Sequence, residues 1–519
     1  MRLFLTMALL AQVWAGSAQV YFNKQIDWQQ NEDVLGYIVA TGDYRNFLAA
    51  GGSLSLDPYL DQLLITRFDS LGEPQGAKVH LPSGSNFGSA RDAVQLDGQY
   101  SLIMGSFYTF ANGIENGQIF LIKINTLTGD TVWTKQYGKP DWHDFGRSMI
   151  KTIDGGFAIV GKTFQANNQP PEKILLIKID SNWNQVFRRE YSTNSGNNHS
   201  GWAIEETCDS GFILSCIMGY QGVCLGCLTS DFMNDFLVIK TDGLGNQQWV
   251  RKFTPWEWKQ YSWGGYDIKP LQDSTYIIFG NKYYYIYNQT FTYYSRYMLF
   301  RFGNDGVLLD FTSFGGGAGT LVTSAIQTKD HNFLVTAAEN DSSFSGIGQT
   351  GVLLKISPSL QLLWKKEYHI SPPEVKLYEK FFDAIELPDK SFIVCGRAFE
   401  DCTNSNGWIL RVDSLGCLEP GCQLNSAIED PPAPEQDIGI SLSPNPTTGQ
   451  ARLALTHEGA VLLSVRVLDM QSRVVSDMQY LRSAGWREVD IDLSQQLSGI
   501  YIVQVRTSEG AGARKVIKQ

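Results

Sequence analysis

The sequence repeats one pattern seven times, and this repetition restricts the fold more than any other feature of the chain. Each copy contains a turn aspartate followed closely by a short apolar run, as in DGGFAIVG from residue 154. The turn aspartates are Asp43, Asp97, Asp154, Asp209, Asp273, Asp330 and Asp389, spaced 54 to 64 residues apart. A period of this length predicts an array of identical units rather than one compact core.

A second marker follows each aspartate, namely an apolar run with a basic residue at a fixed place, as in LLIKID at 175–180. The basic residues are Arg67, Lys123, Lys178, Lys240, Arg301, Lys355 and Arg411. A ring of such residues could contact a ligand. Long basic side chains near strand ends more often extend to water, however, and we expect that role for these seven.

Each unit is expected to form a meander of four strands. In the third unit the strands are expected at 148–153, 157–163, 174–180 and 185–191, with a hairpin turn at Asp154 and Gly155. The third strand is apolar at consecutive positions, so both faces of its sheet must be covered. Radial stacking of the copies covers both faces, and we therefore predict an all-β chain with a seven-bladed β-propeller.

The last unit lacks its own fourth strand. In other units this strand carries an aromatic residue two positions before a basic one, as at Trp133 and Lys135. The same spacing occurs near the N-terminus at Phe22 and Lys24. We therefore predict that residues 20–26 form the outer strand of the last blade and close the ring.

Composition and the first residues indicate an exported chain without nucleic-acid partners. The net charge is -11, and no cluster of basic residues could neutralise phosphates. Residues 1–18 combine Arg2, an apolar run and small residues, which predicts a signal peptide cleaved after Ala18. No other apolar run is long enough to span a bilayer, so we expect no transmembrane segment in the mature chain. The expected location is outside the cell or on its outer surface.

The C-terminal region has its own pattern. Residues 425–437 are rich in prolines and acids, which is typical of a linker. Short alternating strands follow, together with SPNPTTG at 443–449, SGIYIVQV at 498–505 and a closing ARKVIKQ. These motifs resemble the C-terminal sorting domain of type IX secretion substrates from Bacteroidota. The matching motif positions are Pro444, Asn445, Pro446, Gly449, Gly499, Tyr501 and Lys518.

The resemblance implies that this region carries the rest of the chain across the outer membrane, with the secretion machinery as its partner. The strand pattern predicts a small Ig-like β-sandwich. The expected organisation is a signal peptide at 1–18, a propeller at 19–424, a linker at 425–437 and a sorting domain at 438–519.

The eight cysteines fall in the fourth and the seventh unit. They are Cys208, Cys216, Cys224 and Cys227 in the fourth, and Cys395, Cys402, Cys417 and Cys422 in the seventh. An even number in an exported chain predicts disulfides, with three possible connectivities for each group of four. A zinc or redox site at Cys224 and Cys227 is the alternative, but we expect no metal and no cofactor.

The most probable binding surface in this pattern is the face that holds the connections between the second and third strands. These connections, at 105–118, 217–234, 281–296 and 337–350, are predicted to be long irregular loops. Two neighbouring segments are rich in aromatic rings, which can stack on sugars or anchor a protein. The candidate ligand-binding residues are Trp256, Trp258, Tyr261, Trp263, Tyr283, Tyr284 and Tyr285. The alternative is that these rings pack against one another to hold the loops.

Three functions agree with this pattern. The first is a secreted or surface module that binds a glycan or a protein, the second is a propeller enzyme acting on polysaccharide, and the third is a structural surface-layer protein. No catalytic motif is present, so no catalytic residue is assigned. Pairs such as Asp141 and Asp144 could act as acid and base, but we expect them to be solvated loop carboxylates.

Overall fold

The computed structural model separates the chain into two compact units, Met1–Gln423 and Leu424–Gln519. It describes residues 21–28, 32–56, 59–80, 85–111, 114–165, 171–192, 198–221, 232–253, 261–288, 290–317, 319–340, 348–370, 378–399, 405–419, 422, 440–455, 462–469, 474–479, 487–507 and 511–519. The elements formed by these residues are all β-strands. The predicted signal peptide and the predicted linker lie outside the described residues.

The described part of the N-terminal unit contains seven antiparallel sheets of four strands. The first three are β2 (Glu32–Ala40), β3 (Asn46–Leu56), β4 (Tyr59–Asp69), β5 (Pro74–His80); β6 (Ser85–Gln95), β7 (Tyr100–Ala111), β8 (Ile114–Asn125), β9 (Thr131–Tyr137); and β10 (Trp142–Lys151), β11 (Phe157–Gln165), β12 (Lys173–Ile179), β13 (Gln185–Tyr191). The next three are β14 (Asn198–Glu206), β15 (Phe212–Gln221), β16 (Phe232–Thr241), β17 (Gln247–Phe253); β18 (Tyr261–Pro270), β19 (Tyr276–Asn288), β20 (Thr290–Phe302), β21 (Leu308–Gly317); and β22 (Thr320–Gln327), β23 (Phe333–Asn340), β24 (Gln349–Ile356), β25 (Leu362–Tyr368). The seventh is β26 (Glu379–Glu386), β27 (Phe392–Phe399), β28 (Ser405–Val412) and β1 (Phe22–Ile26).

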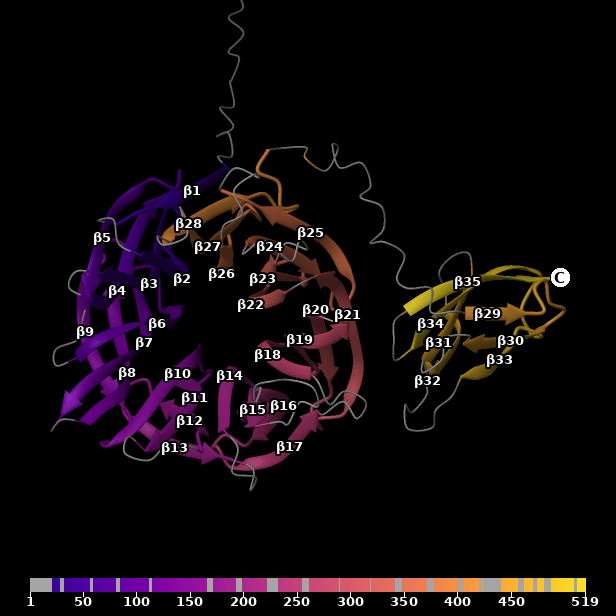
Figure 1. The fold of residues 1–519 in the computed structure, drawn as a ribbon, viewed down its shortest axis with the longest axis horizontal. Coiled ribbons are helices and arrows are strands. Elements are labelled where there is room, and N and C mark those ends of the chain that lie inside the picture. The colour runs from indigo at the N-terminus through magenta and orange to yellow at the C-terminus, as the bar shows by residue number, and fades with distance from the viewer. Residues whose placement is uncertain are drawn as a thin grey trace, which may run out of the picture. The chain divides into compact units, whose positions relative to one another are not determined.

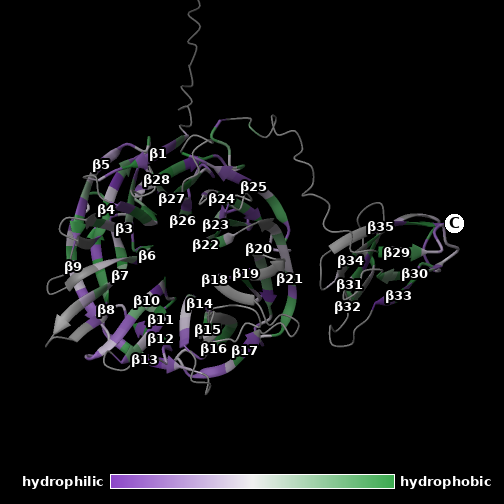
Figure 2. Ribbon diagram, in the orientation of Figure 1, coloured by the Kyte–Doolittle hydropathy of each residue, from purple (hydrophilic) through white to green (hydrophobic). Residues whose placement is uncertain are grey.

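The sheets are arranged around a common centre, as Figure 1 shows. The first strand of each sheet contacts the first strand of the next, and β26 of the seventh sheet contacts β2 of the first. Apolar side chains fill the spaces between neighbouring sheets, whereas outer strands such as β13 and β17 carry hydrophilic residues (Figure 2). The unit is therefore all-β and propeller-like, with a separate core between each pair of sheets.

The N-terminal strand completes the last sheet. β1 pairs antiparallel with β28, with Phe22 opposite Arg411 and Ile26 opposite Gly407. This is the pairing that the displaced aromatic and basic residues of the N-terminus predicted. The seventh sheet thus joins the first strand of the unit to the last. The ring cannot open there without breaking the backbone hydrogen bonds between β1 and β28.

The outer strands hold the tight turns of neighbouring sheets. The hydroxyl group of Tyr191 on β13 donates to the carbonyl of Gly245 at 2.6 Å, and Tyr368 on β25 donates to Gly416 at 2.7 Å. Gly245 has a φ of +74°, and a Cβ atom there would lie 2.7 Å from the ring of Phe187. The repeated aromatic residue of the outer strand therefore packs on the turn glycine of the next sheet.

We had expected the basic residues of the third strands to extend freely to water, and this expectation is wrong. Five of them bind the turn aspartate of their own unit, so the two sequence markers are the two partners of an ion pair. The pairs are Asp154 with Lys178 (2.8 Å), Asp209 with Lys240 (2.9 Å), Asp273 with Arg301, Asp330 with Lys355 (3.2 Å) and Asp389 with Arg411 (2.9 Å). The third strand is covered on both faces, so a charged side chain there needs a partner.

The glycine that closes the repeated motif has a steric role. Gly161 on β11 lies opposite Gly146 on β10, directly before a bulge in β10. A Cβ atom on Gly161 would lie 1.8 Å from the carbonyl oxygen of Phe145, and one on Gly51 would lie 1.7 Å from that of Val34. These two sheets therefore need a glycine at this position, whereas Cys216 and Ala337 occupy the corresponding place in the fourth and the sixth sheet.

Two of the predicted irregular loops are regular strands instead. Residues 105–118 belong largely to β7 and β8, and 281–296 largely to β19 and β20, which pair as far as Asn288 and Thr290. These segments are rich in tyrosine, phenylalanine and threonine, whose preference for strands outweighs the turn residues among them. Of 217–234 and 337–350, the parts at 222–231 and 341–347 lie outside the described residues.

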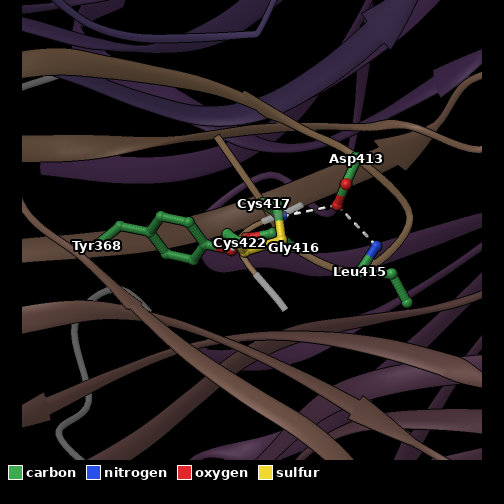
Figure 3. Close-up of a disulfide and its surroundings, with 6 residues drawn as sticks. All are labelled: Tyr368, Asp413, Leu415, Gly416, Cys417 and Cys422. Atoms are coloured by element: carbon green, nitrogen blue, oxygen red, sulfur yellow. Dashed lines mark hydrogen bonds between the residues drawn. A yellow bond between two sulfur atoms is a disulfide. The ribbon is translucent and has the colours of Figure 1, made fainter. Parts of the chain in front are cut away.

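The prediction that all cysteines form disulfides is wrong for three of them. Cys417 and Cys422 are bonded, with their Cα atoms 5.6 Å apart, in a turn where Asp413 accepts hydrogen bonds from two backbone N–H groups (Figure 3). Cys208 is free and exposed, and Cys216 and Cys395 are free and buried. The two buried thiols pack in apolar clusters as small hydrophobic residues. Cys224, Cys227 and Cys402 lie outside the described residues.

The C-terminal unit contains two sheets around one apolar core. One sheet is formed by β29 (Ile440–Ser443), β30 (Gln450–Leu455) and β33 (Glu488–Asp492). The other is formed by β31 (Leu462–Asp469), β32 (Val474–Gln479), β34 (Gly499–Thr507) and β35 (Ala511–Lys518). Leu453 and Ile491 of the first sheet and Val467 and Val503 of the second share the core.

Candidate functional site

The first strand of every sheet contains a β-bulge, and the extra residue of each bulge lines one axial cavity. Bulges re-aim side chains, and here they give one inward position per sheet. The seven residues, which we call the bulge ring, are Gly36, Arg91, Arg147, Trp202, Tyr266, Thr323 and Phe382. The cavity has a volume of about 680 Å³ and is lined by the first strands of all seven sheets. This size is typical of small-molecule sites.

Two arginines stand side by side in the bulge ring, on the neighbouring strands β6 and β10. Burial and the nearby Arg91 lower the pKa of Arg147 below its ordinary value. The Arg147 guanidinium lies 4.7 Å from the ring centroid of Trp202. Among the described residues, no hydrogen bond or ion pair engages the guanidinium of Arg91 or Arg147. One side of the ring is therefore cationic, and within the described residues its two guanidinium groups form no direct ion pair.

The next side of the bulge ring is aromatic. The rings of Trp202 and Tyr266 meet edge to face with centroids 5.0 Å apart. The indole Nε1 of Trp202 is buried and has no hydrogen-bond partner within the described part of the chain. A buried N–H group without a partner is costly.

Three aspartates directly follow bulge residues and join neighbouring sheets. Each carboxylate accepts a hydrogen bond from a backbone N–H on the first strand of the next sheet: Asp92 from Met149 (2.6 Å), Asp267 from Ala325 (2.7 Å) and Asp383 from Ile38 (3.1 Å). Burial raises the pKa of Asp92 to about 7 and that of Asp383 to about 6. These two carboxyl groups therefore exchange protons close to neutral pH.

Asp267 also takes part in a buried ion-pair triad. The ammonium group of Lys269 lies 2.8 Å from Glu205 and 2.9 Å from Asp267. Burial lowers the pKa of Lys269, but the two carboxylates outweigh burial and raise it above its ordinary value. The positive charge of Lys269 is thus neutralised by carboxylates of the protein itself.

Lys380 gives the cavity a third cation. Its ammonium group lies 4.9 Å from the ring centroid of Phe382, and no ion pair involves it among the described residues. Burial, with Arg397 nearby, lowers the pKa of Lys380 to about 8. The cavity thus combines cations, aromatic rings and groups that titrate near neutral pH, which suits binding of a polar ligand or proton transfer to it.

In the C-terminal unit the predicted sorting-motif residues lie together near the ends of β34 and β35. Asn445, between Pro444 and Pro446, donates to the Lys515 carbonyl at 2.6 Å and accepts from the Ile517 N–H at 2.9 Å. Gly499 pairs with Lys518, whose ammonium group donates to the Ser494 carbonyl at 3.2 Å. The remaining contacts are from Tyr501 Oη to the Leu497 carbonyl (2.7 Å) and from the Leu493 N–H to the Gly449 carbonyl (2.6 Å).

Residues 441–519 match the model of the secretion system C-terminal sorting domain. The resemblance seen in the sequence is thereby confirmed, and the sorting domain indicates export followed by secretion or attachment to the cell surface. No curated protein matches the chain. Within the described residues, no helix has the length and apolar character needed to cross a bilayer, and no group of His, Cys, Asp or Glu side chains is placed to hold a metal ion.

Several solved structures are similar to the chain, all at low identity. One is a polysaccharide lyase of family 25, an ulvan lyase, with 10% identity, a TM-score of 0.48 and coverage of 78% of this chain and 99% of that one. Another is the β-propeller domain of the Trilobed protease from Pyrococcus furiosus, with 11% identity, a TM-score of 0.37 and coverage of 73% and 95%. A third is the α-L-arabinofuranosidase Arb93A of Fusarium graminearum, with 10% identity, a TM-score of 0.37 and coverage of 76% and 96%. Likeness at this level carries no inference about the chemistry of this chain.

The aromatic residues predicted to bind a ligand are only partly within the described structure. Trp256 and Trp258 lie outside it. Tyr261 and Trp263 are at the beginning of β18, and Tyr283, Tyr284 and Tyr285 are near the end of β19. The backbone register places Tyr261 opposite Tyr284 and Trp263 opposite Lys282. The predicted patch thus shares β18 with Tyr266 of the bulge ring, and its ligand-binding role stays a prediction.

The bulge ring itself was missed, although the sequence contains a signal for it. Six of its members stand seven positions before the turn aspartate of their unit, and Arg91 stands six before because Asp97 comes one position earlier in a turn of the same length. The expectation for Asp144 was also wrong: it is fully buried on β10 and pairs with Arg188 at 2.7 Å. Asp141, by contrast, is exposed in a turn.

Proposed function

We propose that this chain is an exported binding module that recognises a saccharide in the axial cavity of a seven-bladed β-propeller. The observation that carries the proposal is the bulge ring, which gives one cavity about 680 Å³ in volume a row of arginines next to a row of aromatic rings. Flat aromatic rings stack on sugar faces, and charged or amide groups around them fix the orientation of the hydroxyl groups. The Ig-like sorting domain would carry the propeller out of the cell, where it is released or held at the surface.

The predicted aromatic residues extend this site in the proposal. Trp263 precedes Tyr266 by three residues on β18, so a saccharide longer than the cavity would pass from the bulge ring toward the aromatic strand ends. Trp256 and Trp258 belong to the connection that leads into β18. This arrangement favours recognition of a chain of sugars over recognition of a single one.

A glycan array tests the proposal. The mature chain should retain a defined set of glycans, and Trp202→Ala should remove that retention because Trp202 lies in the cavity wall. A triple variant, Trp256→Ala with Trp258→Ala and Trp263→Ala, should weaken longer glycans more than short ones. Tyr44→Ala is the matched control, because Tyr44 is exposed in a turn of the first sheet. Unchanged retention in both test variants would reject the site.

An enzyme acting on polysaccharide is the second candidate, and one observation favours it. Asp92, Asp383 and Lys380 line the same cavity, and their pKa values lie at about 7, about 6 and about 8. Groups that titrate near the working pH are suited to general acid and base catalysis. The test is the appearance of new reducing ends in a polysaccharide that the array has identified. Enzymatic cleavage requires their appearance with the natural chain and their loss with Asp92→Asn or Asp383→Asn.

A further inference from the structure

Arg91 and Arg147 in the axial cavity have no ion-pair partner among the described residues, and this feature specifies the ligand further. The buried basic side chains of the described residues are Lys178, Lys240, Lys355 and Arg411, and each forms an ion pair with a turn aspartate. Arg91 and Arg147 are partly buried in the cavity wall and have no such partner among the described residues. Glu172 is near enough to raise the pKa of Arg147 against the effect of burial, but this carboxylate forms its ion pair with Lys162, at 2.6 Å.

The carboxylates that do line the cavity are already engaged. Asp267 shares the ammonium group of Lys269 with Glu205, at distances of 2.9 Å and 2.8 Å. Asp92 and Asp383 each accept backbone hydrogen bonds from the neighbouring sheet, and burial holds a proton on them to higher pH than usual. None of these carboxylates forms an ion pair with Arg91 or Arg147 among the described residues.

We infer that the ligand carries an anionic oxygen group, a carboxylate or a sulfate ester on a saccharide, and that Arg91 and Arg147 bind this group. The inference rests on the proposed saccharide-binding function and names the class of saccharide. Planar guanidinium groups bind such oxygens with paired hydrogen bonds. The two arginines come from strands that contact each other, so one anionic group can reach both.

The aromatic residues complete the recognition of an acidic sugar. Trp202 stands beside Arg147, with the guanidinium 4.7 Å from the indole centroid. The ring of Trp202 also meets that of Tyr266 edge to face, with centroids 5.0 Å apart. An acidic sugar would thus place its charged substituent at Arg91 and Arg147 and its ring against Trp202 and Tyr266. A neutral sugar would satisfy only the aromatic part of the site.

Calorimetric titration of the full mature chain with three tetrasaccharides tests the inference. The probes are a tetramer of galacturonic acid, the same tetramer as its methyl ester, and a neutral tetramer carrying sulfate esters. At least one anionic probe should bind tenfold or more tightly than the ester, and the preference should weaken as salt is added. Preference for the acid or for the sulfated probe identifies which anionic group the arginines bind.

Variants separate the arginines from the rest of the site. Arg147→Gln and Arg91→Gln should each weaken the preferred anionic probe by about tenfold or more and leave the ester unchanged. Lys151→Gln removes the same charge from an exposed position on the strand of Arg147, and it should change nothing. Thermal unfolding checks that each variant is folded, and Arg91→Gln tests the inference independently if Arg147→Gln is not.

The outcomes distinguish this inference from the proposed function. Equal binding of the ester and both anionic probes, unaffected by the two arginine variants, would overturn the anionic class and leave saccharide binding standing. Binding of an anionic probe that survives both variants would also overturn the assignment to Arg91 and Arg147. If no probe binds and the glycan array is empty as well, the proposed function fails together with the inference.

Discussion

The carboxyl group of Asp92 should make the N-terminal unit less stable as the pH rises from 4 to 8. In the folded chain burial raises its pKa from 3.8 to about 7. In the unfolded chain it ionises at the ordinary value. Between these two pKa values the unfolded state has lost the proton and the folded state still holds it. The stabilisation is therefore complete below pH 3.8 and is lost as the pH rises toward 7.

The size of the effect follows from the shift. A difference of about three pKa units corresponds to about 4 kcal/mol, since one unit is worth about 1.4 kcal/mol. Asp92→Asn removes the titration and keeps a side chain of the same shape, with an amide oxygen that can accept the Met149 N–H. Relative to the natural chain, the variant should therefore gain about 4 kcal/mol of unfolding free energy between pH 4 and pH 8.

Urea unfolding followed by tryptophan fluorescence measures this gain. Trp486 is the only tryptophan after residue 424, so the signal reports mainly on the N-terminal unit. The quantity of interest is the difference in unfolding free energy between variant and natural chain, determined at several pH values. A difference that stays constant from pH 4 to pH 8 would refute the argument, because it would mean that Asp92 titrates alike in both states.

A control on the same sheet should change in the opposite direction. Asp97 lies in an exposed turn, where hydrogen bonds from the N–H groups of Gln99 and Tyr100 lower its pKa. Its stabilisation is present above the unfolded pKa and is lost as the pH falls. Asp97→Asn should therefore cost more stability at pH 7 than at pH 3.

Three further predictions concern the repeat and the thiols. Lys240 is almost fully buried, whereas its partner Asp209 is 43% exposed. Asp209→Asn leaves the buried ammonium group without its carboxylate and should cost about 3 kcal/mol in urea unfolding, whereas Lys240→Met should cost about 1 kcal/mol. Equal costs would contradict the burial argument. Gly161→Ala should cost about 3 kcal/mol or prevent folding, because its Cβ would lie 1.8 Å from a carbonyl oxygen of β10, and a melting temperature close to that of the natural chain would contradict this steric role. Iodoacetamide should label exposed Cys208 in the folded chain and spare Cys216, whose pKa is raised by burial, as peptide mapping would determine.

The architecture could be predicted because its causes repeat in the sequence. The turn aspartates set the period, and the doubly apolar third strands required covered sheets. The spacing of Phe22 and Lys24 predicted the partner of β28, because the outer strand of every sheet has to pack on the next turn. Each of these signals is local, and seven copies make it visible above the variation of single units.

The partners of the charged residues could not be predicted in the same way. Lys178 and Asp154 are 24 residues apart, and only the pairing of β11 with β12 brings them together. The free thiols of Cys216 and Cys395 show the same limit, since an even number of cysteines says nothing about which of them face an apolar core. Residues 105–118 and 281–296 were predicted to be loops, so the strands that they largely form were missed.

The cavity residues were missed for a reason that also explains where the function is encoded. The repeat preserves the turn aspartate and the covered strand, and in five of the seven sheets a glycine such as Gly161 lies opposite the residue before the bulge. None of these contacts restricts the bulge residue itself, which faces the cavity and not a neighbouring strand. It varies from Gly36 to Arg147 and Trp202 while its distance from the turn stays nearly fixed. Such positions can give the centre a chemistry of its own, so residues that keep their distance from the turn but change their identity help to define the ligand.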